Sequence, residues 1–343
     1  MKSKVYFINN ITELDKLLNQ IDLTRYIKSD DYVAGKIHFG EEGNKAYLKP
    51  QNIKPIFSAI EKVAPHTFLT DCNTIYKGSR SDSVNHLKTA KKHGYDFAPL
   101  IIADGLFGHN VIKVTVDLKH FKEVSLGACI VEADAIVCFT HFKGHDVTGF
   151  GGALKNMGMG NGSRAGKQLM HADIKPQVIA KSCTGCGICV KWCPTSAITM
   201  DKKIARIDLA KCIGCAECIA ACRFAAIGIS WAGTPNSVQE KIAEYAAGAI
   251  KDKKGKIIYF NFLLEISPNC DCYAHNDPPI VPDIGILFSD DPVAIDQASL
   301  DLVNQKAGKD IFKELYPNVD GTVQLQYAQK IGLGQRQYEL ITG

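Results

Sequence analysis

Two stretches of the sequence repeat one cysteine pattern: Cys183-Thr-Gly-Cys186-Gly-Ile-Cys189-Val-Lys-Trp-Cys193-Pro194 and Cys212-Ile-Gly-Cys215-Ala-Glu-Cys218-Ile-Ala-Ala-Cys222-Arg223. Each stretch has the spacing C-x2-C-x2-C-x3-C, which is typical of cysteines that ligate [4Fe–4S] clusters. A structural zinc site takes four ligands, usually from separated C-x2-C pairs, and fits two complete runs poorly. The pattern therefore predicts two [4Fe–4S] clusters, held by eight of the 13 cysteines.

The fourth cysteine of each run is predicted to ligate the cluster of the other run. Three thiolates on one tight loop reach three irons of a cluster, and in two-cluster proteins the fourth thiolate comes from the second loop. One cluster is assigned to Cys183, Cys186, Cys189 and Cys222. The other cluster is assigned to Cys212, Cys215, Cys218 and Cys193.

The segment around these runs, residues 176–231, resembles a bacterial-type two-[4Fe–4S] ferredoxin. Its two halves read as a duplicated unit, each with a cysteine loop, a turn of helix after the fourth cysteine and a short strand, at residues 197–200 and 226–230. Arg223 departs from the pattern, because Pro194 holds the equivalent position in the first run. Its guanidinium either points inward, which would raise the potential of the nearby cluster, or faces solvent.

The composition of the 343-residue chain excludes several classes of protein. The formal net charge of +4 is too small to indicate nucleic-acid binding. No stretch approaches eighteen uninterrupted apolar residues, so no membrane span is expected, and the N-terminus lacks the pattern of a signal peptide. We therefore expect a cytoplasmic protein. Thirteen cysteines in that compartment indicate metal or redox chemistry and not disulfides, and such clusters suggest an anaerobic cell.

Short apolar runs alternate with helical patterns on both sides of the cysteine segment. Strands are predicted at residues 4–8, 32–37, 67–71, 111–116, 135–140, 256–262 and 283–288. Helices are predicted at residues 10–20, 54–63, 81–93, 126–132, 151–157, 237–249, 292–307 and 322–331. This alternation is typical of an α/β fold with a largely parallel sheet and helices on both faces.

The predicted elements after the cysteine segment are too few for an independent domain. We therefore predict one discontinuous α/β domain, residues 1–175 and 232–343, interrupted by an inserted α+β ferredoxin-like domain at residues 176–231. Insertion is tolerated where the ends of the inserted unit lie close together. Three consecutive domains are the alternative.

The segment from His141 to Arg164 is the richest candidate site outside the cysteine runs. It follows a predicted buried strand, where α/β folds place ligands, and its glycines allow the backbone to approach a ligand closely. Basic side chains and the N–H groups of the following helix start would hold an anion. The predicted substrate-binding residues are Lys143, Gly151, Gly152, Asn156 and Arg164. His141, His145 and Lys155 are predicted to be catalytic, with a histidine delivering a proton; a metal site on these histidines is the less favoured alternative.

A second candidate site is Asn269-Cys270-Asp-Cys272-Tyr-Ala-His275. Neighbouring thiolates can act as nucleophiles, exchange disulfides or bind a metal. Cys270 and Cys272 are therefore predicted to be catalytic, with a third metal centre at this pair as a possibility. The alternative is two structural loop cysteines. Cys72 and Asn73 follow one predicted strand and could line the same crevice, and His38, after another predicted strand, could join them.

These motifs together resemble one family, the iron–sulfur-binding family numbered 362 among the domains of unknown function. The matching stretches are the segment His141 to Gly160, the cysteine runs, Asn269 to Cys272 and the region Pro282 to Asp296. The resemblance implies an α/β fold interrupted by a two-cluster ferredoxin, and it implies no particular reaction. The main domain is also distantly similar in architecture to the nickel-pincer lactate racemase family.

The sequence favours a ferredoxin-dependent reductase, in which electrons pass through the clusters to a small, anionic substrate in the crevice. Reduced ferredoxin or flavodoxin is the expected donor, because the chain lacks the G-x-G-x-x-G fingerprint of nicotinamide sites. One alternative is a non-catalytic electron carrier that docks a partner oxidoreductase. Another is a metal-handling or maturation protein that uses the Cys270 and Cys272 thiols.

Overall fold

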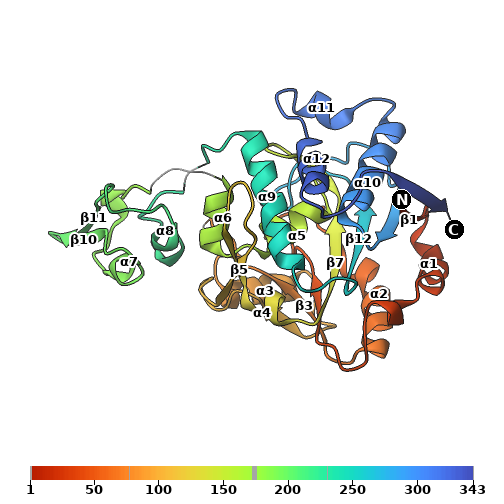
Figure 1. The fold of residues 1–343 in the computed structure, drawn as a ribbon, viewed down its shortest axis with the longest axis horizontal. Coiled ribbons are helices and arrows are strands. Elements are labelled where there is room, and N and C mark those ends of the chain that lie inside the picture. Colours follow the sequence, from red (N-terminus) through yellow and green to blue (C-terminus); the bar gives the residue numbers. More distant parts are fainter. Residues whose placement is uncertain (1, 77, 172–175, 230, 343) are drawn as a thin grey trace.

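An eight-stranded sheet forms the centre of the computed structural model, which describes residues 2–76, 78–171, 176–229 and 231–342 (Figure 1). The strand order is β14 (Tyr338–Thr342), β1 (Ser3–Ile8), β13 (Gly285–Ser289), β12 (Ile257–Leu263), β7 (Ala135–His141), β2 (Val33–Lys36), β3 (Thr67–Asp71) and β4 (Leu100–Ile102). β13 runs antiparallel to both of its neighbours, and the other adjacent strands of this sheet are parallel. The predicted largely parallel α/β sheet is confirmed.

Helices cover both faces of this sheet. One face is packed by α1 (Leu14–Gln20), α2 (Pro50–Val63) and α3 (Ser83–Lys92). The other is packed by α5 (Ala153–Asn161), α9 (Pro235–Ile250), α10 (Pro292–Ala307) and α12 (Val323–Lys330). Alternate residues of a strand point to opposite faces, so in β7 Val137 joins the first core and Ile136 the second. Both are fully buried, which explains the continuous apolar run of this strand.

Shorter elements connect these layers. They are the 3-10 turns η1 (Ile11–Glu13) and η2 (Leu23–Arg25), the strands β5 (Val111–Thr115), β6 (Glu123–Gly127), β8 (Lys143–His145) and β9 (Gly149–Gly151), and the helices α4 (Ala128–Glu132), α6 (Arg164–His171) and α11 (Ile311–Leu315). β5 was predicted within the alternating strand and helix pattern, but it pairs with β6 in a hairpin outside the main sheet. Among the described helices, none is both long and apolar enough to cross a bilayer.

The cysteine segment, residues 176–231, lies at one end of the molecule (Figure 1). It contains η3 (Ala180–Ser182), α7 (Ile188–Lys191), β10 (Ile198–Asp201), β11 (Ile204–Ile207) and α8 (Glu217–Ala221). The strands β12, β13 and β14 follow this segment in the chain, yet they join the sheet that contains β7, which precedes it. This is the connectivity that an insertion requires.

Two details of the cysteine segment differ from the prediction. The turns of helix, α7 and α8, precede the fourth cysteine of each run instead of following it. The predicted strand 226–230 is reduced to one antiparallel bridge between Ile227 and Val178, and its last residue lies outside the described residues. Both halves keep the short apolar stretch, but within the described residues a partner strand is present for the first alone, because β11 follows it directly.

Several side-chain contacts attach the cysteine segment to the rest of the protein, among them three that involve a cation or an aromatic ring. The Arg164 guanidinium donates to the carbonyl oxygens of Ala220 at 2.6 Å and of Thr74 at 2.9 Å, so it joins both parts. The Trp192 ring stacks on His109 with centroids 3.9 Å apart. Arg223 lies over the ring of Phe107, with its guanidinium carbon 4.0 Å from the ring centroid. Arg223 is exposed, as one of the two predicted orientations has it, and it makes a cation–π contact across this boundary.

Candidate functional site

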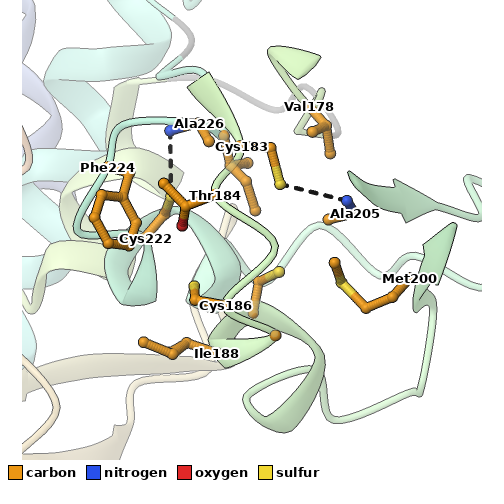
Figure 2. Close-up of a pocket in the computed structure, with 13 residues that line it drawn as sticks. Val178, Cys183, Thr184, Cys186, Ile188, Met200, Ala205, Cys222, Phe224 and Ala226 are labelled. Atoms are coloured by element: carbon orange, nitrogen blue, oxygen red, sulfur yellow. Dashed lines mark hydrogen bonds between the residues drawn. The ribbon is translucent and has the colours of Figure 1, made fainter. Parts of the chain in front are cut away.

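The eight cysteines of the repeated runs line two separate apolar cavities. The first cavity contains Cys183, Cys186, Cys189 and Cys222 (Figure 2). The second contains Cys193, Cys212, Cys215 and Cys218. In each cavity three cysteines come from one run and the fourth from the other, as the spacing predicts. These two sets of thiols fit the ligand requirement of two [4Fe–4S] clusters, four cysteines each.

The two halves of the cysteine segment repeat their backbone conformation as well as their sequence. Gly187 and Ala216 hold equivalent positions and both have left-handed backbone, with φ of 71° and 61°. A backbone N–H donates to the fourth cysteine of each run over 3.2 Å, from Ala197 to Cys193 and from Ala226 to Cys222. Amide donors to the sulfurs are one of the features that set cluster potentials. The duplication therefore extends to the environment of the thiols.

A third cavity, of about 550 Å³, lies beyond the carboxyl ends of β2, β3 and β7. Parallel sheets place ligand sites at this edge. Most of the predicted residues line it: His145, Lys155, Cys270, Cys272, Lys143, Gly151, Gly152 and Asn156, with Cys72 and His38. Three predicted residues, Asn73, His141 and Arg164, are not part of its lining. Asn73 is instead hydrogen-bonded to the Asp104 carboxylate.

His141 holds the loop of the thiol pair in place instead of facing the cavity. Its Nδ1 lies 3.0 Å from the Asp271 carboxylate and its Nε2 lies 3.0 Å from the Leu264 carbonyl oxygen. The Lys143 ammonium is 3.3 Å from the same carboxylate. Burial would raise the pKa of Asp271, but His141 and Lys143 outweigh it and lower that pKa. Both ring nitrogens of His141 are thus used within the protein, so His141 is a positioning residue.

Arg164 belongs to the boundary with the cysteine segment. Its guanidinium donates hydrogen bonds to the backbone carbonyl oxygens of Thr74, Ile75 and Ala220. The prediction that it binds substrate is therefore not supported by its position. Its basic character suits a different task, because a planar guanidinium can bridge several carbonyl groups at once.

The predicted anion site at the start of α5 is filled by a carboxylate of the protein itself. The Asp296 carboxylate accepts hydrogen bonds from the N–H groups of Ala153 at 2.7 Å and Leu154 at 2.9 Å. A Cβ atom on Gly152 would lie 2.3 Å from this carboxylate, so a glycine is needed for the close approach. Gly152 therefore serves helix capping, and anion binding in the cavity is left to side chains.

Lys155 and Lys167 supply positive charge to the cavity. Within the described residues neither forms an ion pair with a carboxylate; Lys167 donates to backbone carbonyl oxygens, and the Lys155 ammonium lies 3.6 Å from the Cys270 sulfur. Burial would lower the pKa of Lys155, but the Cys270 and Cys272 thiols outweigh it and raise that pKa. A buried cation without a carboxylate partner favours an anionic ligand.

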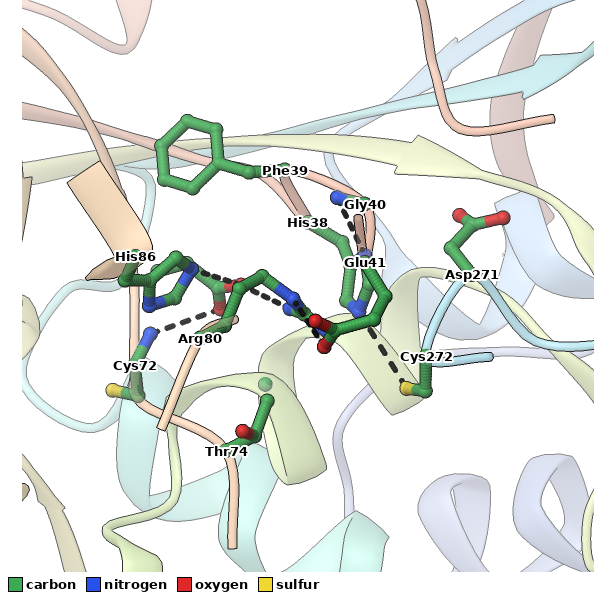
Figure 3. Close-up of polar contacts among 12 residues, drawn as sticks. His38, Phe39, Gly40, Glu41, Cys72, Thr74, Arg80, His86, Asp271 and Cys272 are labelled. Carbon is green, nitrogen blue, oxygen red and sulfur yellow. Dashed lines mark hydrogen bonds and ion pairs between the residues drawn. The ribbon is translucent and has the colours of Figure 1, made fainter. Parts of the chain in front are cut away.

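Cys270 and Cys272 form a close pair of unequal thiols. Their sulfurs are 3.0 Å apart, and the Cys272 sulfur lies 3.5 Å from His38 Nε2 (Figure 3). The hydrogen bond between the two sulfurs, reinforced by the Lys155 charge, holds the pKa of Cys270 well below its usual value despite burial. The same hydrogen bond raises the pKa of Cys272. Cys270 is therefore the more acidic thiol of the pair.

A buried ionic network that the sequence did not indicate supports this cavity. Arg80 lies 3.3 Å from Glu41 (Figure 3). It also lies 3.4 Å from Asp71, and Lys36 lies 3.1 Å from Asp71. All four side chains are almost completely buried. Asp71 and Lys36 end two adjacent strands, which is a recognisable signal for a site at this edge. Arg80 follows in a loop and carries no such signal.

His86, beside this network, predicts a pH dependence of folding stability. Burial lowers the pKa of His86 from 6.5 to about 3. Between these values the unfolded chain binds more protons than the folded protein, so stability is lost as pH falls from about 6.5. The free energy of unfolding, measured by urea denaturation, should therefore fall less between pH 7 and pH 5 in His86→Leu than in the wild type. The control His275→Leu changes an exposed histidine and should show the same fall as the wild type. An equal fall of the unfolding free energy in both variants would contradict the prediction.

The fold and these cavities define a class of protein: an α/β protein with two four-cysteine cavities and a third cavity that contains a thiol pair and two lysines, Lys155 and Lys167, without a carboxylate partner among the described residues. A family model described as "Domain of unknown function (DUF362)" matches residues 33–301. The chain belongs to this family.

Comparisons with curated proteins and with solved structures give no further information about the function of this family. No curated protein matches the sequence. The chain is similar to a solved structure of the lactate racemase apoprotein from Thermoanaerobacterium thermosaccharolyticum, with 11% identity and a TM-score of 0.40. The match covers 77% of this chain and 51% of that structure, so the chain spans about half of its length.

Proposed function

We propose that this protein is an iron–sulfur oxidoreductase that relays electrons through two [4Fe–4S] clusters to a small anionic substrate in the third cavity. The clusters would be held by the two sets of four cysteines. They would supply one-electron transfer at low potential, and the protein would supply the binding site and its charges. A cytoplasmic location suits the many free thiols of such a protein.

One observation carries the proposal: Ile75 and Tyr76 belong both to the wall of the third cavity and to the core of the cysteine segment. Ile75 is buried in the apolar cluster that includes Cys189 and Cys218, and Tyr76 packs against that cluster. The Tyr76 hydroxyl reaches the cavity side, where it donates to the Cys272 carbonyl oxygen over 3.2 Å. Packed side chains thus run without a break from the cysteine cavities to the thiol pair.

The charge of the third cavity supports an anionic substrate. The lining contains Lys143, Lys155, Lys167 and Arg80, against the carboxylates of Asp71 and Asp146. Lys143 and Arg80 already have carboxylate partners. Among the described residues, Lys155 contacts the Cys270 sulfur and Lys167 donates to carbonyl oxygens, so both ammonium groups can also bind an anionic ligand. A carboxylate or phosphate is the group that such ammonium donors bind best.

The electron donor would be reduced ferredoxin, flavodoxin or a partner oxidoreductase. Ile213, next to Cys212, is 66% exposed and lines the second cysteine cavity. A large apolar side chain exposed beside a redox centre is a suitable contact for a transient partner. A non-catalytic carrier would share this surface, so the third cavity distinguishes the two functions.

Lys155→Met is expected to remove anion binding while leaving the iron content unchanged. Anaerobic thermal unfolding should show that inorganic phosphate or a panel of small carboxylates raises the Tm of the wild type, because binding to the folded state stabilises it. The exposed Lys91 provides a control variant, Lys91→Met, which should respond like the wild type. If no anion raises the Tm of the wild type, the carrier function is favoured over the enzyme.

A further inference from the structure

We propose that Cys270 and Cys272 form a dithiol–disulfide couple, which accepts two electrons, one from each cluster. This inference rests on the proposed function and adds a third redox centre to it. The couple would store an electron pair at the cavity surface and pass it to the substrate. It also assigns a role to the two thiols that differs from metal binding.

The geometry of the pair suits a disulfide. The sulfurs are 3.0 Å apart, and a disulfide bond is about 2.05 Å long, so bond formation needs an approach of about 1 Å. The residue between them, Asp271, is fixed by His141 and Lys143, and its carbonyl oxygen accepts from the Glu41 N–H over 3.0 Å. The loop is therefore anchored while the two sulfur atoms remain in the wall of the cavity.

The hydrogen bonds of two histidines favour this chemistry over a metal centre. His38 Nδ1 accepts from the Gly40 N–H at 3.1 Å, and His145 Nδ1 accepts from the N–H groups of Val147 and Thr148 at 3.2 Å. A neutral imidazole that accepts at Nδ1 carries its proton on Nε2. That nitrogen then has no free electron pair for a metal, and it donates a hydrogen bond instead.

One of these Nε2–H groups is directed at a sulfur of the pair. His38 Nε2 lies 3.5 Å from the Cys272 sulfur, and His145 lines the same cavity as Cys270. Burial lowers the pKa of both rings, which keeps them neutral. The His145 Nδ1 atom also lies 3.4 Å from the Asp146 carboxylate, a contact that would be an ion pair only if the ring were charged. The two backbone N–H groups that donate to Nδ1 exclude the proton that a charged ring would carry there. The Cys272 sulfur thus has one imidazole donor.

The redox step balances in atoms and electrons. The sulfur–sulfur bond would break as the pair takes up two electrons, one from each of the clusters that the eight cysteines would hold, and one proton from solvent would enter through the cavity. The products on the protein would be a Cys272 thiol and a Cys270 thiolate. Lys155, 3.6 Å from Cys270, stabilises the thiolate, and stabilising the reduced form makes a disulfide easier to reduce.

A reductive titration tests the couple in the intact protein. The purified holoprotein is first equilibrated anaerobically with oxidised glutathione, desalted, and titrated with electrons from a photoreduced deazaflavin while the cluster absorbance is followed. The wild type should take up about four electrons per chain, two for the clusters and two for the disulfide. Cys270→Ser/Cys272→Ser should take up about two, a loss of half.

The control variant is Cys72→Ser, because Cys72 lines the same cavity but has no thiol partner among the described residues. It should take up as many electrons as the wild type. Equal uptake by wild type and double variant, with iron content unchanged, would overturn the couple and leave the proposed function standing. Metal beyond the two clusters that disappears in the double variant would also overturn it. Wild type without clusters would instead refute the proposed function.

Discussion

Replacing Cys183 and Cys222 together by alanine should remove one cluster and leave the other intact. The two thiols line one cavity, although they come from different runs. The wild type is expected to contain about eight irons and the double variant about four. Anaerobic iron and sulfide analysis with EPR of the reduced protein measures both quantities.

The matched control is Cys183→Ala/Cys193→Ala, which removes two cysteines of the same run. These thiols line different cavities, so both clusters should be damaged and iron should fall below that of the first variant. The opposite order, with about four irons in the control and fewer in the first variant, would mean that each run holds its own cluster. Iron that stays near zero in the anaerobic wild type would exclude clusters altogether.

Arg80→Met should cause a large loss of folding stability. The substitution removes the partner of Glu41 and one partner of Asp71, both buried, and leaves the Tyr76 hydroxyl without its 2.8 Å donor. Removing one member of a buried ion pair costs about 3–5 kcal/mol, because the remaining charge is uncompensated. Urea unfolding under anaerobic conditions measures this loss.

Arg223→Met is a suitable comparison for Arg80→Met. Arg223 is exposed and makes only a cation–π contact with Phe107 among the contacts described, so its loss should cost about 0.5–1 kcal/mol. Equal losses for the two variants would show that the Arg80 network adds little beyond a surface contact. Contacts other than the ion pairs of Arg80 with Glu41 and Asp71 would then have to hold the ends of β2 and β3 in place beside the cavity.

Local patterns in the sequence predict much of the fold. The β3 strand and the α10 helix have the predicted bounds, and α10 begins where Asp291 accepts hydrogen bonds from the N–H groups of Val293 and Ala294. The missed strand β14 has half-exposed residues at the edge of the sheet, so it lacks a buried apolar run. β5 has an ordinary strand pattern, and nothing in that pattern distinguishes a separate hairpin from the main sheet.

The candidate site likewise has features that local sequence patterns predict and features that depend on residues far away in the chain. The cysteine grouping and the thiol pair follow from spacing, because the chemistry depends on neighbours in the chain. The roles of His141 and Gly152 depend on partners 130 and about 144 positions away, Asp271 and Asp296, which no local pattern relates to them. The predicted substrate-binding role of Arg164 is not supported for a similar reason. The local sequence around a basic residue at the end of a glycine-rich segment is the same whether that residue binds substrate or joins two parts of the protein.

The most direct test of electron transfer to the third cavity is the reoxidation of reduced clusters. Protein reduced with a stoichiometric one-electron donor is mixed anaerobically with small carboxylates, with phosphate esters or with buffer, and the return of the cluster absorbance is timed. The account predicts that at least one anion accelerates reoxidation in the wild type and that Lys155→Met loses the acceleration. Reoxidation that no anion accelerates, but that an added oxidised flavodoxin accelerates equally in both proteins, would contradict it and identify an electron carrier.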